Sequence, residues 1–128
     1  MIRILIIEDD EVTNFIAKTN LERFGYKNIS IALNGQLGLD YLKTNTSPDV
    51  ILLDINMPVL DGWDFLNKLN ELNLASEIPV VITTSSFRGD DKLKADSYPN
   101  IIEYLEKPIN FQYLNTILSK VKLKSYDL

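Results

Sequence analysis

The sequence predicts an α/β fold: a doubly wound, five-stranded parallel sheet in the order 2-1-3-4-5, with five helices on its two faces. Short apolar runs alternate five times with segments of helical period, which is the pattern of βαβ units. Four of these runs end in polar residues. The 128 residues, 45% of them apolar, are enough for one hydrophobic core. We therefore expect residues 1–128 to form a single domain with right-handed crossovers.

The first strand is predicted at residues 3–7, where only Ile and Leu follow Arg3, as in a strand that is buried on both faces. A helix follows and is expected to stop at Phe24-Gly25, because glycine favours the end of a helix. Helical spacing predicts the buried face of this helix. That face contains Val12, Phe15, Ile16 and Thr19.

The second strand is predicted at residues 28–33. Its alternating apolar residues are Ile29, Ile31 and Leu33. Asn34-Gly35 then leads into the second helix, in which Leu39 and Leu42 are expected to point inward. Ser47-Pro48 ends this helix, because the residue before a proline disfavours helical geometry.

The third strand is predicted at residues 50–53 and leads directly into Asp54. A loop shaped by Pro58 and Gly62 precedes the third helix. The buried stripe of that helix is predicted to contain Phe65, Leu66, Leu69 and Leu72. The fourth strand is predicted at residues 79–84, with a proline at its first position, where a missing backbone donor is tolerated.

The fourth helix, at residues 89–98, is the weakest element, because it offers only Leu93 and Ala95 as apolar residues before its last position. We expect it to be short or mobile. The fifth strand is predicted at residues 101–105, and Asn110 is expected to cap the last helix. The apolar positions of that helix keep helical spacing: Phe111, Leu114, Ile117, Leu118 and Val121.

Composition excludes several kinds of chemistry. The chain has no cysteine, and therefore no disulfide, thiol nucleophile or thiolate zinc site. It has no histidine, which excludes Ser-His catalysis, histidine metal ligation and phosphohistidine donation by this chain. A net charge of −5 argues against binding of nucleic acid, which needs a basic face. No apolar run has the length of a membrane span, and we expect a cytoplasmic protein.

The polar residues at four strand ends are expected to form one site, because the carboxyl ends of parallel strands meet at one edge of the sheet. These residues are Glu8-Asp9, Asp54, Thr84 and Lys107. Two carboxylates about 4 Å apart repel by about 4 kcal/mol at an effective dielectric near 20, so the acids should take up a proton or recruit a cation. Hard oxygen ligands with room for water favour Mg²⁺ over zinc. An aspartate can then attack phosphorus, while a hydroxyl and an ammonium hold the other phosphoryl oxygens.

The chain resembles the response regulator receiver domains of two-component signalling over nearly its whole length. The resemblance is carried, in order, by residues 4–10, residues 52–58 with Asp61-Gly62, residues 79–85 and residues 104–108. It implies the flavodoxin-like receiver fold and Mg²⁺ as cofactor. It also implies that Asp54 takes a phosphoryl group from a phosphohistidine on a sensor histidine kinase or a histidine phosphotransfer protein.

The resemblance further implies a metal-binding role for several residues. Asp9 would bind Mg²⁺ directly, and Glu8 would hold it mainly through water. Asp54 would also bind the ion, and Asn56 would contribute its backbone carbonyl. Asp10 lies nearer the helix N-terminus and is expected to be a cap.

The remaining implied roles concern switching. Thr84 and Tyr104 would be the switch pair: the hydroxyl moves toward the phosphoryl group and the ring turns inward. Lys107 would contact the phosphoryl group, aimed by a cis peptide bond to Pro108. The surface of helix 4, strand 5 and helix 5 would then change its binding to an unknown downstream protein.

Alternatives stay open at this point. Acids at a strand-to-helix junction are often only caps, and a lysine before proline is usually a surface cation. A degenerate receiver would take no phosphate. An aspartyl-phosphate phosphatase would have an acid where this chain has Asn56. We expect a stand-alone receiver without an output domain, since the chain ends at Leu128, and no enzymatic activity beyond phosphorylation and dephosphorylation of its own aspartate. The side chains of Asn56 and Ser86 are expected to tune that dephosphorylation.

Overall fold

The computed structural model describes residues 2–44, 47–72, 77–85 and 89–121. Its strands form one parallel sheet in the order β2-β1-β3-β4-β5, which confirms the predicted topology. The strands are β1 (Arg3–Ile7), β2 (Asn28–Ala32), β3 (Val50–Asp54), β4 (Val80–Thr84) and β5 (Ile101–Glu106). The helices are α1 (Glu11–Arg23), α2 (Gly35–Thr44), α3 (Gly62–Glu71), α4 (Gly89–Ala95) and α5 (Phe111–Leu118). A bilayer-spanning segment would need a longer, more apolar helix than any found in the described ranges.

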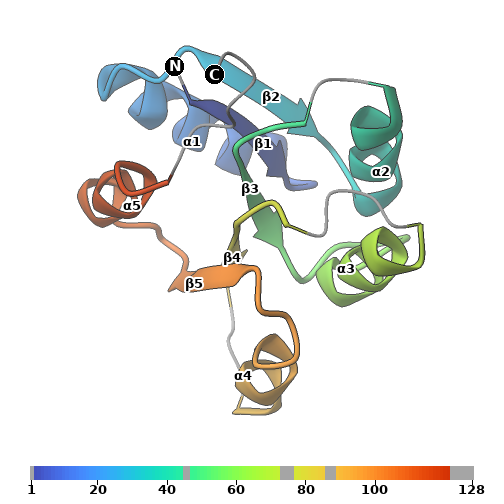
Figure 1. The fold of residues 1–128 in the computed structure, drawn as a ribbon. Helices are drawn as coiled ribbons and strands as arrows, with labels where there is room; N and C mark the ends of the chain where they lie inside the picture. Colours follow the sequence, from blue (N-terminus) through green and yellow to red (C-terminus); the bar gives the residue numbers. More distant parts are fainter. Residues whose placement is uncertain (1, 45–46, 73–76, 86–88, 122–128) are drawn as a thin grey trace, which may run out of the picture.

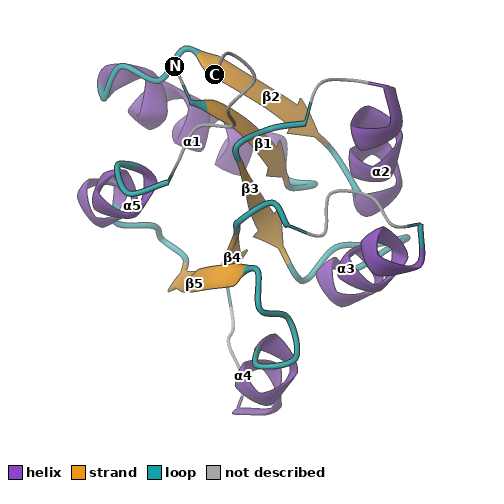
Figure 2. Cartoon of the chain, in the orientation of Figure 1, coloured by secondary structure: helices purple, strands orange, loops and turns teal. Residues whose placement is uncertain are grey.

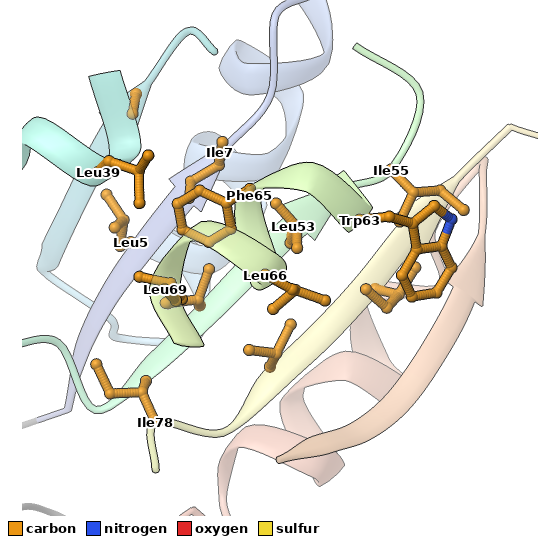
Figure 3. Close-up of a cluster of buried hydrophobic side chains, with 14 of the residues drawn as sticks. Leu5, Ile7, Leu39, Leu53, Ile55, Trp63, Phe65, Leu66, Leu69 and Ile78 are labelled. Atoms are coloured by element: carbon orange, nitrogen blue, oxygen red, sulfur yellow. The ribbon is translucent and has the colours of Figure 1, made fainter. Parts of the chain in front are cut away.

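The sheet lies between two helical layers, with α2 and α3 on one face and α1 and α5 on the other (Figure 1). Figure 2 shows the same arrangement by secondary structure. Strand β1 serves both cores, as alternation along a strand requires: Leu5 and Ile7 pack with α2 and α3, and Ile4 and Ile6 pack with α1 and α5. Figure 3 shows the first core, in which the ring of Phe65 lies among side chains of the sheet.

The buried face of α1 differs from the predicted one. Val12, Phe15 and Ile16 are 66%, 71% and 48% exposed, and Thr19 is only partly buried. The helix packs on the sheet through a different set of residues, Asn14, Ala17 and Leu21. Both sets have helical spacing. The second set faces inward because Asn14 reaches a backbone acceptor there and an alanine allows the helix to lie close.

Two other elements end earlier than predicted. Strand β2 ends at Ala32, one residue before the predicted end, and Ile31 and Leu33 are exposed because β2 is an edge strand of the sheet. The predicted burial of Leu72 is wrong: Leu72 is exposed, since α3 ends at Glu71 and the next residue is only its cap. The other predicted core residues of α3 are buried, as expected.

Helix α4 is short, as predicted: it has seven residues, and Ala95 is the buried one. Beside it, the ring of Trp63 from the first turn of α3 stacks on Tyr98, with centroids 5.8 Å apart and planes at 24°. Nζ of Lys94 lies 5.9 Å from the centroid of the Trp63 ring, within cation–π range. Trp63 therefore has a packing role, and these contacts attach the small α4 to α3.

The loop between β3 and α3 contains a strained turn. The backbone N–H of Leu60 donates to the carbonyl of Pro58 at 2.8 Å, which closes a three-residue turn around Val59. Val59 has a φ of 72°, a region that β-branched residues rarely adopt, and its side chain is 86% exposed. Packing therefore gives Val59 no compensation for its backbone conformation.

Replacing Val59 by glycine is expected to raise the free energy of unfolding by about 1 kcal/mol. The change removes left-handed strain of about 1–2 kcal/mol, less the extra chain entropy that glycine adds to the unfolded state. For a chain of this length that corresponds to a rise of about 4 °C in Tm. Denaturant and thermal unfolding measure it, with Val59→Ala as a control that should gain less. An unfolding midpoint below that of the wild type would contradict the strain assignment.

Candidate functional site

The residues predicted at the strand ends come together in the structure. Glu8 follows β1, Asp54 ends β3, Thr84 ends β4 and Lys107 follows β5. Carboxylate oxygens of Glu8, Asp9 and Asp54 lie within 4.8 Å of one another. The carboxyl edge of the sheet therefore carries an acidic cluster with a hydroxyl and an ammonium beside it.

Glu8 is 3% exposed and is held at several points. Its backbone N–H donates to the carbonyl of Ala32 at 3.0 Å, and its own carbonyl accepts from Nδ2 of Asn14 at 2.9 Å. Its carboxylate accepts from the backbone N–H of Asp10 at 3.1 Å. Asn14 is not among the residues predicted from the sequence. Helical spacing alone does not identify it, because the exposed stripe of α1 has the same spacing.

The predicted acceptor, Asp54, is buried at the end of β3. The backbone N–H of Asn56 donates to Oδ1 of Asp54 at 3.1 Å. Nδ2 of Asn56 donates to Oγ1 of Thr84 at 2.9 Å, and Thr84 is fully buried. Asn56 is exposed and bridges the carboxylate and the hydroxyl. The resemblance implies its backbone carbonyl as a metal ligand and does not reveal these two contacts.

The ammonium of Lys107 lies inside the acidic cluster. It forms an ion pair with Glu8 and lies 3.6 Å from Oδ2 of Asp54. The backbone N–H of Lys107 donates to the carbonyl of Thr84 at 2.7 Å, which fixes the chain beside β4. The peptide bond between Lys107 and Pro108 is cis, as the resemblance implies. One cation thus offsets part of the charge of three carboxylates.

The two other acids of the first turn differ in role. Loss of solvent and a hydrogen bond with the side chain of Glu8 raise the pKa of Asp9 above its ordinary value. Asp10 caps α1, because its carboxylate accepts from the backbone N–H of Thr13 at 3.2 Å. Its hydrogen bonds with the side chain and backbone of Thr13 lower the pKa of Asp10. Asp10 is therefore the predicted cap, and Asp9 is the exposed member of the acidic cluster.

The donor set fits a hard divalent cation. Every ligand atom offered by the cluster is a carboxylate oxygen. The single positive charge of Lys107 does not balance the negative charge of the three acids. Oxygen-only sites with few protein ligands suit Mg²⁺.

Tyr104, the other predicted switch residue, is partly buried and packs against the core under α2 and α3. Ser86 lies outside the described residues.

The response regulator receiver domain is the family whose model matches residues 4–119. The chain is 31% identical over 123 residues to the sensor histidine kinase CheAY of Helicobacter pylori, a match that covers 94% of this chain and 15% of CheAY. It is 28% identical over 119 residues to the chemotaxis protein CheY1 of Helicobacter pylori, covering 93% of this chain and 95% of CheY1. The crystal structure of the chemotaxis protein CheY4 of Vibrio cholerae has a TM-score of 0.83 at 24% identity, covering 95% and 99% of the two chains, which shows the fold alone.

Fold and site together define a class of protein: a small α/β signalling module with an acidic cluster at the carboxyl edge of its sheet. The chain belongs to the response regulator receiver domain family and is a receiver domain of two-component signalling. This membership does not favour the phosphatase alternative. Because the chain spans 15% of the length of CheAY, the activities of that whole protein are not transferred to it.

Proposed function

We propose that this domain is a phosphoryl-controlled switch in which Asp54 is the acceptor. One observation carries the proposal: four strand ends bring the acids, the Thr84 hydroxyl and the Lys107 ammonium to one edge of the sheet. Glu8, Asp9, Asp54 and the backbone carbonyl of Asn56 would hold Mg²⁺. When bound, the ion supplies positive charge to the carboxylates and to the phosphoryl oxygens.

The positions of these groups support the following transfer. A carboxylate oxygen of Asp54 attacks the phosphorus of a phosphohistidine, the P–N bond breaks, and the imidazole nitrogen keeps the electron pair. The product is an acyl phosphate on Asp54. Lys107 Nζ, 3.6 Å from Oδ2 of Asp54, then pairs with a phosphoryl oxygen, and the Thr84 hydroxyl donates to another. Tyr104 turns inward behind Thr84, which alters the α4–β5–α5 surface for a downstream protein.

The test uses a small-molecule phosphodonor, Mg²⁺ and the mass of the intact protein. A gain of one phosphoryl group in the wild type and none in Asp54→Asn is the expected result. Asn56→Ala serves as the control for local disturbance, since it removes the side-chain bond to Thr84 but keeps the backbone bond to Asp54 and leaves the nucleophile in place. No mass gain with any donor would favour a degenerate receiver, and turnover of an unrelated phosphoester would favour a phosphatase.

The phosphodonor is proposed to be a sensor histidine kinase or a histidine phosphotransfer protein that contacts α1. Val12, Phe15 and Ile16 form an exposed apolar ridge on this helix. Beside them is a pocket of about 460 Å³ that α1 shares with the turn after β5 and whose lining includes Lys107. The pocket connects the ridge with the site, since its lining includes both Ile16 and Lys107. We expect a partner that places its phosphohistidine over Asp54 to cover the ridge as well.

Replacing Phe15 by aspartate is expected to reduce transfer from a phosphorylated histidine phosphotransfer protein by roughly 30-fold, the effect of losing one anchor of about 2 kcal/mol. Phosphorylation by a small-molecule donor should not change, because Phe15 lies outside the acidic cluster. Leu37→Asp is the matched control, since Leu37 is an exposed apolar residue of α2 on the opposite face. Equal losses in the two variants would contradict contact through α1.

We also propose that the domain has no catalytic activity apart from turnover of its own acyl phosphate. A cytoplasmic location stays a prediction.

A further inference from the structure

Asn14 is a buried amide on the inward face of α1, next to the acidic cluster. It is 4% exposed, and its neighbours on that face are Ala17 and Leu21. Nδ2 of Asn14 donates to the backbone carbonyl of Glu8 at 2.9 Å. Oδ1 is buried, and the described residues offer it no hydrogen-bond partner.

This half-satisfied amide is unfavourable for stability. A buried carbonyl oxygen without a partner destabilises the folded state, whereas an apolar side chain of the same size avoids that cost. Packing alone therefore favours leucine at position 14, beside Ala17 and Leu21. The hydrogen bond from Nδ2 of Asn14 to the backbone carbonyl of Glu8 explains why an amide stands at this position.

That bond fixes the turn that carries the first two acids. The backbone N–H of Glu8 is already held by Ala32, and the N–H of Asp10 is held by the Glu8 carboxylate. Because a peptide unit is planar, fixing the Glu8 carbonyl also fixes the N–H and the Cα of Asp9. The Asn14 amide thus makes the third hydrogen bond that fixes this turn, whose carboxylates lie within 4.8 Å of Asp54.

We propose that Asn14 is a positioning residue for the Glu8–Asp9 acid pair. It orients the peptide plane between the two acids so that both carboxylates face Asp54. The inference deepens the proposed function, since it names a residue outside the cation's ligands that sets the affinity for Mg²⁺. Outer hydrogen bonds of this kind affect metal affinity by roughly 10- to 100-fold.

The test compares Asn14→Leu with Asn20→Leu in the full chain. Asn20 is a matched control because its Nδ2 also donates to a backbone carbonyl of α1, that of Ile16 at 2.8 Å, away from the cluster. Titration with Mg²⁺ alone should show at least a roughly tenfold loss of affinity in Asn14→Leu and no loss in Asn20→Leu. The Tm of metal-free Asn14→Leu should stay close to that of the wild type, because the variant removes the unsatisfied Oδ1 of Asn14 but leaves the Glu8 carbonyl without its donor. A loss of Mg²⁺ affinity at a nearly unchanged Tm is a result that a purely structural role does not give.

A metal-free measurement keeps this inference separable from the proposed function. Hydrogen exchange of the Asp10 amide, which the Glu8 carboxylate holds, should become at least about tenfold faster in Asn14→Leu. This result supports the inference even if the wild type binds no Mg²⁺ or takes no phosphoryl group. Unchanged exchange together with unchanged Mg²⁺ affinity overturns it, as does an equal loss of affinity in Asn20→Leu. Asn14→Ala replaces the leucine variant if that protein does not fold.

Discussion

Replacing Lys107 by alanine is expected to lower the free energy of unfolding of the metal-free protein by about 2 to 3 kcal/mol. Breaking a buried ion pair costs about 3–5 kcal/mol because it leaves one charge without a partner, and the value is reduced here for partial screening by water. The side chain of Glu8 is 4% exposed and that of Lys107 is 20% exposed. Among the ion pairs of the described residues, Glu8 has Lys107 as its partner, so without the ammonium it lies beside Asp9 and Asp54 with no counter-charge.

Denaturant unfolding in a chelating buffer measures the loss, and Mg²⁺ in excess should recover most of it. The ion binds the folded state, where the oxygens are assembled, and it no longer competes with the ammonium for Glu8. Lys68→Ala is the matched control, because Lys68 forms an exposed pair with Glu71 at 3.8 Å, and such pairs contribute little. A midpoint equal to that of the wild type would show that the Lys107 pair does not stabilise the metal-free fold.

Replacing Gly62 by alanine is expected to destabilise the protein by about 3 kcal/mol and to slow phosphorylation of Asp54. A Cβ at this position would lie 2.7 Å from Cα of Ile55 and 2.9 Å from the carbonyl oxygen of Asp54. Both atoms belong to the backbone, so no side-chain rotation relieves the clash. The strand end has to move, and the Asp54 carboxylate moves with it.

Gly89→Ala is the control for this substitution. Gly89 also begins a helix, but a Cβ there would meet no atom within 4 Å. Alanine favours helices over glycine by up to about 1 kcal/mol, so the control should be neutral or slightly stabilised. Thermal unfolding and the rate of phosphorylation by a small-molecule donor separate the two variants. A Gly62→Ala protein as stable as the wild type would contradict the close contact between α3 and the end of β3.

The sheet and the edge that carries the site could be predicted from the sequence because strong local signals specify them. In the sequence, strands β1, β3 and β4 contain continuous apolar runs, and polar residues follow at the end of each run. In a doubly wound sheet those ends meet, so Glu8, Asp54 and Thr84 could be placed together without coordinates. The same logic placed Lys107 after β5.

The face of α1 could not be predicted in this way. Two stripes of α1 have helical spacing, and the more apolar one, with Phe15, is the exposed one. Hydrophobic periodicity identifies an amphipathic helix but gives the wrong orientation when the apolar stripe is on the surface and the inward stripe contains Asn14. The inward stripe is chosen by a tertiary hydrogen bond to Glu8, which no local pattern contains.

The side-chain contacts inside the site could not be predicted from the sequence either. Spacing places Lys107 and Asn56 at the right edge, but the partner of each depends on how the strand ends and loops pack in three dimensions. In the structure Lys107 pairs with Glu8, and the Asn56 amide holds the Thr84 hydroxyl. Both contacts involve side chains that are far apart along the chain.

Trp63 gives the molecule an optical signal of its own. It is the single tryptophan of the chain, it is 8% exposed, and it lies between the site loop and α4. Its indole is stacked on Tyr98 and lies close to the ammonium of Lys94, so its emission depends on where these two side chains are. Fluorescence of the unlabelled protein therefore reports on the contact between α3 and α4. The emission spectrum can be followed while ligands are added to the acidic cluster, which lies beside the N-terminus of α3.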